Sequence, residues 1–182
     1  MKIQRYILFA LAFLLGVNAF GQSSADAKKV LDNAAAIVGR RGGAAANFSI
    51  TGGEIGRTSG SIAIKNNKFK AVTPETTIWF DGKTQWAYMK NTNEVNISTP
   101  NEAQRLSMNP YAFITMYKSG YRLSMKTTTD SYIVHLQAIH PARSMQEFYV
   151  TVSKAYYPQQ IKMLQGKKWV TINISNFRAA SQ

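Results

Sequence analysis

The chain of 182 residues offers few side chains suited to acid–base or nucleophilic chemistry. It contains no cysteine, which excludes thiol nucleophiles, disulfides, iron–sulfur clusters and cysteine-type zinc sites. Its two histidines, His135 and His140, stand five residues apart without a neighbouring cluster of carboxylates, so they do not match a metal-ligand pattern. We therefore expect no catalytic residues and no bound metal.

Two short motifs resemble parts of enzyme sites only superficially. The run Gly56-Arg57-Thr58-Ser59-Gly60 suggests a phosphate-binding loop, but it lacks the Gly-Lys-Ser/Thr ending and precedes a predicted strand instead of a helix. Asp81 could act as a lone acid, yet Asp-Gly between two predicted strands is typical of a hairpin turn. Both motifs are interpreted as turns, and the sequence predicts neither an enzyme nor a cofactor.

The more unusual chemistry of the chain is apolar. Its middle part is rich in large apolar side chains, namely Trp79, Phe80, Trp86, Tyr88, Phe113, Met116 and Tyr117. The chain also has seven methionines, whose flexible side chains suit surfaces that accept apolar ligands. The same side chains could pack an ordinary core, so composition predicts an apolar interior without deciding whether that interior is filled or hollow.

The charge of the chain points to an anionic partner. Lys and Arg number 22 against 9 Asp and Glu, which gives a formal net charge of +13. Such a charge favours nucleic acid, phospholipid headgroups or an acidic protein. The basic residues are scattered, and no RNA-recognition signature is visible. We therefore expect phospholipid or protein partners, and no nucleic acid.

Residues 1–21 are typical of a secretory signal peptide. Lys2 and Arg5 precede an apolar run of 11 residues at 7–17, which is too short to span a bilayer comfortably. Ala19-Phe20-Gly21 places small residues where signal peptidase reads the chain. We expect cleavage before Gln22, export to the periplasm, and a mature domain of residues 22–182.

Regular elements must position the apolar side chains. Val30, Leu31, Ala34, Ile37 and Val38 recur every three or four residues, which predicts an amphipathic helix over 24–38. Asn109-Pro110 predicts the start of a second short helix that ends near Tyr117. Alternation of apolar and polar residues predicts about eleven short strands, at 48–50, 62–64, 69–73, 77–80, 84–89, 94–98, 121–126, 132–138, 148–153, 159–165 and 168–174.

The connections between these strands predict the fold class. Most neighbouring strands are joined by short turns, and parallel pairs need long crossovers, so the sheet is expected to be antiparallel. One face of such a sheet must be covered, and the two predicted helices are the natural cover. The sequence therefore predicts a single α+β domain, rich in β structure. The tail after Phe177 is expected to fray.

The stretch from Gly60 to Lys126 resembles the LolA family, the periplasmic carriers of outer-membrane lipoproteins. Its most recognisable block is 80–88, Phe-Asp-Gly-Lys-Thr-Gln-Trp-Ala-Tyr, an Asp-Gly-Lys-Thr turn followed by Trp-x-Tyr. The glycine-led strand 60–65, the pair Phe69-Lys70 and the helix start at Asn109-Pro110 follow the family's order. The leading helix after a signal peptide also fits.

The resemblance implies a curved antiparallel sheet, an unclosed half-barrel of about eleven strands with helices as a lid over an apolar cavity. It implies a monomeric, non-enzymatic carrier that takes acyl chains from an inner-membrane lipoprotein-releasing transporter and passes them to an outer-membrane receptor. The missing cysteine favours the soluble carrier over the lipid-anchored receptor. In the family an arginine follows the lysine of the glycine-led strand, whereas here Asn66 follows Lys65.

The predicted acyl-chain lining combines inward-facing strand positions with the mid-chain helix. Its residues are Ile62, Ile64, Phe69, Ile78, Phe80, Trp86, Tyr88, Phe113, Ile114, Met116, Tyr117 and Met125. The face on which each strand residue lies depends on register, because a slip of one residue moves every side chain to the other face. Two alternatives stay open: a periplasmic β-rich protein that binds another amphipathic ligand or a glycan, and a lipid-sensing interaction module.

Overall fold

The computed structural model describes residues 18–53, 56–100, 116–143 and 145–180. Within these residues the chain forms one helix followed by eleven strands. Their bounds are α2 (Asn18–Val38), β1 (Ala44–Gly52), β2 (Gly56–Lys65), β3 (Lys68–Val72), β4 (Thr76–Phe80), β5 (Gln85–Met89), β6 (Glu94–Ser98), β7 (Tyr121–Thr127), β8 (Ser131–Ala138), β9 (Glu147–Ser153), β10 (Pro158–Gln165) and β11 (Lys168–Ala179).

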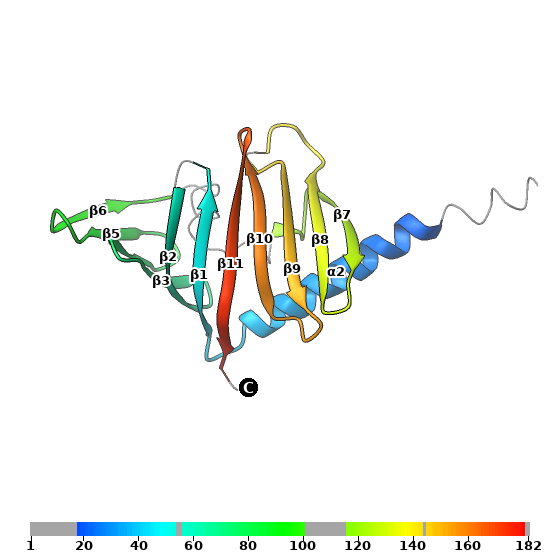
Figure 1. Ribbon diagram of the computed structural model, residues 1–182, viewed down its shortest axis with the longest axis horizontal. Helices are drawn as coiled ribbons and strands as arrows, with labels where there is room; N and C mark the ends of the chain where they lie inside the picture. The colour runs from blue at the N-terminus through cyan, green and yellow to red at the C-terminus, as the bar shows by residue number, and fades with distance from the viewer. Residues whose placement is uncertain (1–17, 54–55, 101–115, 144, 181–182) are drawn as a thin grey trace, which may run out of the picture.

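All eleven strands belong to one antiparallel sheet with the order β6-β5-β4-β3-β2-β1-β11-β10-β9-β8-β7. Consecutive strands are neighbours except for β6 and β7, and the pairing of β1 with β11 joins the first and last strands in the middle of the sheet. The edge strands β6 and β7 do not pair with each other, so the sheet is not closed (Figure 1). This confirms the predicted antiparallel, unclosed β-rich fold.

Helix α2 lies along one face of the sheet and packs on β7 and β8 (Figure 1). Of the residues predicted to share one stripe, Val30, Leu31, Ala34 and Val38 are buried, whereas Ile37 is only partly buried. Ala27, one turn earlier, is buried as well. The helix ends at Val38, where the N–H of Gly39 donates a hydrogen bond of 2.8 Å to the carbonyl of Ala35. It begins at Asn18, earlier than the predicted start at residue 24.

The core is a set of cross-strand rows on the sheet face that meets α2. The register aligns Val134 of β8 with Val150 of β9, Ile161 of β10 and Ile172 of β11. These four side chains are 0–1% exposed. Within the described residues, this part of the interior is closely packed, as protein interiors generally are. No helix of the described residues is long and apolar enough to cross a membrane.

The turn between β2 and β3 explains why Asn66 occupies the position at which the family has an arginine. Asn66 has a φ of 57°, in the left-handed region that asparagine tolerates better than most residues. Arginine lacks the short polar side chain that makes this conformation accessible. Lys65 and Lys68 pair directly across the turn, so Asn66 serves the hairpin geometry.

The end of the chain differs from the sequence-based expectation. Strand β11 continues to Ala179, whereas the pattern predicts a strand to 174 and a frayed tail after Phe177. The extension is held by β1, because Ala44 pairs with Ala179 and the N–H of Ala180 donates to the carbonyl of Gly43 over 2.9 Å. A long-range partner, which local sequence does not reveal, orders this segment.

Candidate functional site

The inner face of strands β2 to β4, defined as the face that continues the core under α2, carries most of the predicted lining. Two cross-strand rows form it: Ile62 beside Ala71 and Ile78, and Ile64 beside Phe69 and Phe80. Phe69 and Phe80 have ring centroids 5.3 Å apart. Ile78 is only partly buried. Five of the predicted lining residues therefore come together on one face.

Trp86 and Tyr88 lie on the opposite, outer face of the sheet. Gln85, not Trp86, pairs with Phe80, while Trp86 pairs with Trp79 and Tyr88 with Thr77. The prediction that Trp86 and Tyr88 face the same side as Phe80 is therefore wrong. The physical reason is that Trp86 and Tyr88 alternate with Gln85 and Ala87, so the pattern favours the aromatic side as the buried one, whereas the register with β4 decides the face.

The remaining predicted lining residues come from the second half of the chain and the mid-chain helix. Met125 of β7 pairs with Val134 and is partly buried against the core, as is Met116. Phe113 and Ile114, like most of the predicted helix that contains them, lie outside the described residues. Tyr117 is 4% exposed and belongs to the core.

Tyr117 joins the mid-chain segment to α2 through a polar cluster. Its hydroxyl donates a hydrogen bond to Oδ1 of Asp32, and Nζ of Lys28 lies 2.8 Å from the other carboxylate oxygen, Oδ2. Hydrogen bonds from Lys28 and Tyr117 hold the pKa of Asp32 below its ordinary value. Burial, and then the Asp32 carboxylate, raises the pKa of Tyr117, so its hydroxyl stays a donor. We call these three residues the α2 clasp.

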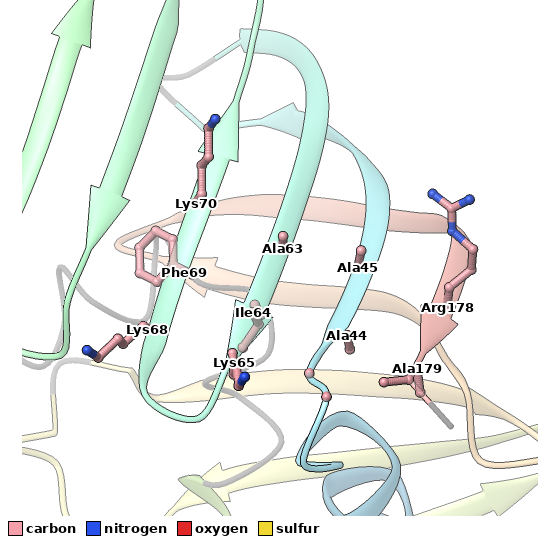
Figure 2. A pocket seen from close by; sticks show the side chains of 13 residues that line it. Ala44, Ala45, Ala63, Ile64, Lys65, Lys68, Phe69, Lys70, Arg178 and Ala179 are labelled. Atoms are coloured by element: carbon pink, nitrogen blue, oxygen red, sulfur yellow. The ribbon is translucent and has the colours of Figure 1, made fainter. Parts of the chain in front are cut away.

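Two open pockets adjoin the sheet. One, of about 490 Å³, lies where β1 and β3 begin and β2 and β11 end (Figure 2). It touches the predicted lining residues Ile64 and Phe69. Its other side chains include four cations, Lys65, Lys68, Lys70 and Arg178. The other, of about 760 Å³, is lined mainly by hydroxyl and amide side chains of β1, β2 and β11 and touches none of the predicted lining residues. Neither is an apolar acyl-chain cavity.

A polar atom interrupts the inner face at the start of β5. Oε1 of Gln85 is buried and has no hydrogen-bond partner among the described residues. Gln85 pairs with Phe80 on one side and Ser98 on the other. A buried acceptor without a partner is costly and calls for an explanation, such as a ligand that donates to it.

His135, one of the side chains considered for catalysis, contacts its neighbours in the sheet. His135 lies 2.9 Å from Oε1 of Glu147 and stacks on the ring of Tyr149 at 4.4 Å. Burial, and then Glu147, raises the pKa of Tyr149. Across the described residues, no three metal-ligating side chains gather in one place.

The Asp81-Gly82 motif forms the β4–β5 turn. Oδ1 of Asp81 accepts hydrogen bonds from the N–H groups of Lys83 at 2.9 Å and Thr84 at 2.8 Å. The N–H of Thr84, then that of Lys83, lowers the pKa of the Asp81 carboxyl. Gly82 has a φ of 106°, which side chains rarely adopt. The turn interpretation of this motif is confirmed.

Comparisons with known proteins agree with this fold. A solved protein from Thermus thermophilus, described as an uncharacterized conserved protein, is similar over 86% of this chain and 89% of its own, with 12% identity and a TM-score of 0.55. A LolA superfamily protein from Nitrosomonas europaea covers 86% of this chain and 94% of its own, with 11% identity and a TM-score of 0.44. A putative outer membrane lipoprotein-sorting protein domain from Vibrio parahaemolyticus covers 87% and 94%, with 11% identity and a TM-score of 0.44.

The sequence itself matches a family model. No curated protein matches the chain significantly. The family model described as "Outer membrane lipoprotein carrier protein LolA" matches residues 17–167, which is most of the chain. That span contains the Asp-Gly-Lys-Thr turn and the strands that form the inner face. The chain therefore belongs to the LolA family of outer membrane lipoprotein carriers.

Proposed function

We propose that this protein is a non-enzymatic periplasmic carrier that binds the acyl chains of lipoproteins on the inner face of its sheet. The observation that carries the proposal is the apolar inner face of β2 to β4, where Ile62 and Ile78 share one cross-strand row and Ile64 and Phe80 share the next. The family match supports the same cargo class. By this reading the carrier collects lipoproteins from a releasing transporter in the inner membrane and delivers them to a receptor in the outer membrane.

The energetics explain why a carrier is needed. Burying an acyl chain gains about 0.8 kcal/mol per CH₂ group, so a chain of about 16 carbons gains on the order of 13 kcal/mol. Such a chain does not cross water unprotected. A carrier must replace the bilayer with an apolar surface of its own, and must still release the chain at its destination.

We place the acyl chains at the β2–β5 half of the inner face. Under α2 the core side chains of β8 to β11 are already buried, at 0–1% exposure. At β4 and β5, by contrast, Ile78, Ala87 and Met89 are only partly buried.

Neighbouring residues of β4 provide a matched test. Ile78 faces inward and Trp79 outward, so the same substitution at each position separates the two faces. We expect the wild type to bind a fluorescent triacylated lipopeptide. Ile78→Ser should weaken that binding about tenfold, since it removes a side chain that buries against the ligand. Trp79→Ser should bind the lipopeptide like the wild type.

Two results would overturn the proposal. One is a wild-type protein that binds no lipopeptide and yields no acylated molecule when its natively purified form is extracted for mass spectrometry. The other is equal loss of binding in both variants, with circular dichroism showing both folded. Release of lipoproteins from spheroplasts into the supernatant by added protein tests the transport step itself.

A further inference from the structure

The outer face of strands β4 to β6 exposes apolar side chains. Trp79 is 39% exposed, Val95 54% and Ile97 67%. The register places Trp79 beside Trp86 and Ile97 in one row, and Tyr88 beside Val95 in the next. We call these five residues the aromatic patch. All five residues of the edge strand β6 are exposed. An exposed apolar patch of this kind marks a surface for interaction.

A group of cations borders the aromatic patch on the same face. Lys70 pairs with Trp79, and its Nζ lies 5.7 Å from the centre of the Trp79 ring. The same row continues from Lys70 through Ala63 and Ala45 to Arg178. Lys65 and Lys68 form the next pair along the β2–β3 hairpin. We call Lys65, Lys68, Lys70 and Arg178 the basic group.

The basic group surrounds the 490 Å³ pocket described above. Figure 2 shows the side chains of Lys70 and Arg178 extending to the same side, with the small residues Ala63 and Ala45 between them. The small residues leave the pocket open between the charges of Lys70 and Arg178. The pocket is therefore wide enough for a phosphate-bearing headgroup and positively charged at its rim.

The charge balance of this face is one-sided. The outward positions of β1 to β6 include no acidic residue. The backbone hydrogen bonds from Thr84 and Lys83 lower the pKa of Asp81 in the β4–β5 turn, and the nearby charge of Lys68 lowers it further. The ion pairs of the described residues, Lys28 with Asp32 and His135 with Glu147, do not involve the basic group. These cations are available to an external anion.

We propose that this outer surface docks on an anionic phospholipid membrane. The aromatic patch would enter the layer between headgroups and acyl chains, where Trp and Tyr are favoured because one end of each side chain is apolar and the other polar. The basic group would contact the headgroup phosphates. Lysine ammonium groups are mobile point charges, which suits a fluid layer of phosphates better than one fixed partner. The inner face stays free, so docking does not depend on acyl-chain binding.

Exposed isoleucines at two ends of the sheet provide a matched test. Ile97 is 67% exposed in the aromatic patch, and Ile139, just after β8, is 65% exposed but far from it in the strand order. Sedimentation with vesicles of phosphatidylglycerol and phosphatidylcholine measures docking. Ile97→Ser combined with Trp79→Ser should bind about tenfold more weakly or worse. Ile139→Ser should bind like the wild type, and circular dichroism checks that both variants are folded.

The charges are tested in the same assay. Lys68→Gln with Lys70→Gln should weaken binding about fivefold per charge removed, and added salt should weaken the wild type more than this variant. Vesicles of phosphatidylcholine alone should bind little protein. Quenching of tryptophan fluorescence by brominated lipid, with Trp169 and Trp86 changed to Phe, reports insertion of Trp79 directly.

Several outcomes would overturn the proposal. Equal binding to neutral and anionic vesicles would show that the basic group does not direct docking. Unchanged binding of the Ile97→Ser, Trp79→Ser double variant would show that the aromatic patch does not enter the membrane. Retention of the protein on immobilised glycan or on a soluble acidic protein, without vesicle binding, would assign the surface to that other partner. Ile78→Ser should dock normally, so failure of lipoprotein binding and failure of docking are distinguishable.

Discussion

At the scale of single residues, the function of an apolar side chain in this protein depends on the face of the sheet it occupies. Ile78, Trp79 and Phe80 are consecutive and all apolar, yet Ile78 and Phe80 face the core while Trp79 faces outward. The predicted inward positions of Ile78 and Phe80 agree with the register. In the next strand the large residues Trp86 and Tyr88 were predicted to face inward, but the pairing with Trp79 and Thr77 places them on the outer face.

The buried Gln85 offers a residue-scale prediction. Its unpartnered Oε1 costs stability, so Gln85→Leu should raise the free energy of unfolding by about 1 kcal/mol. Urea denaturation measures the difference, with Gln160→Leu at an exposed hydrogen-bonded pair as the comparison. A lower stability in Gln85→Leu would mean that the amide has a partner. The same variant should bind lipopeptide more weakly if the ligand supplies the missing donor.

The Asp32 carboxylate gives a second residue-scale prediction. Its pKa is lowered below 3.8 by hydrogen bonds from Lys28 and Tyr117. A lowered folded-state pKa adds stability that is present above the unfolded-state value and is lost as the pH falls through the folded-state value. Near neutral pH the free energy of unfolding of the wild type should therefore exceed that of Asp32→Asn. The difference should be less than about 1 kcal/mol because the carboxylate is half exposed.

Unfolding measured from neutral to acid pH tests this effect. The advantage of the wild type over Asp32→Asn should stay constant above 3.8 and vanish below it. Asp26→Asn, on the exposed side of the same helix, is the control and should show no such difference. If the difference in unfolding free energy between the wild type and Asp32→Asn persisted unchanged into strong acid, the ionised Asp32 carboxylate would not be the source of the stability.

At the scale of elements, local signals were sufficient for most of the fold. The helix was predicted from the spacing of Val30, Leu31 and Ala34, and these residues are buried in α2. Strand positions followed from alternation and from turns such as Asp81-Gly82. What local signals could not predict was the length of β11, because its last residues are ordered by β1 from the other end of the chain.

The packing of α2 on the sheet yields an element-scale prediction. Leu31 is fully buried between the helix and the strands, so Leu31→Ala should lower the free energy of unfolding by about 2–4 kcal/mol. Lys29→Ala, on the exposed side of the same helix, should change it by less than about 0.5 kcal/mol. Thermal and urea unfolding provide the values. Similar small effects in both variants would show that α2 is not a firm part of the core.

At the scale of the whole molecule, an open sheet provides two large faces that serve different purposes. The inner face is apolar and adjoins α2, while the outer face between β1 and β6 combines cations with exposed aromatic and aliphatic side chains. A closed barrel would have hidden one of these surfaces. The family match establishes the carrier fold, and the two faces explain how a carrier could hold cargo while it docks.

Export of the protein is a prediction about the whole chain. We expect the protein isolated from the periplasm to have the mass of residues 22–182, because signal peptidase should cleave after Gly21. Cleavage there would leave the packed part of α2 intact, since its buried residues begin at Ala27. Intact-mass spectrometry checks the cleavage, with a Gly21→Leu variant expected to keep residues 1–21. A wild-type protein that retains these residues would contradict the prediction.

The sequence by itself determined the class of the protein: an antiparallel sheet with a covering helix, few groups suited to catalysis, a strong positive charge and the Asp-Gly-Lys-Thr turn of a carrier family. These features are local or compositional, so a single chain reveals them. Only the tertiary structure decided which apolar side chains share a face, where Lys70 and Arg178 lie relative to each other, and how Tyr117 meets Asp32. Register and long-range pairing control these arrangements, and both depend on contacts between residues far apart in the chain.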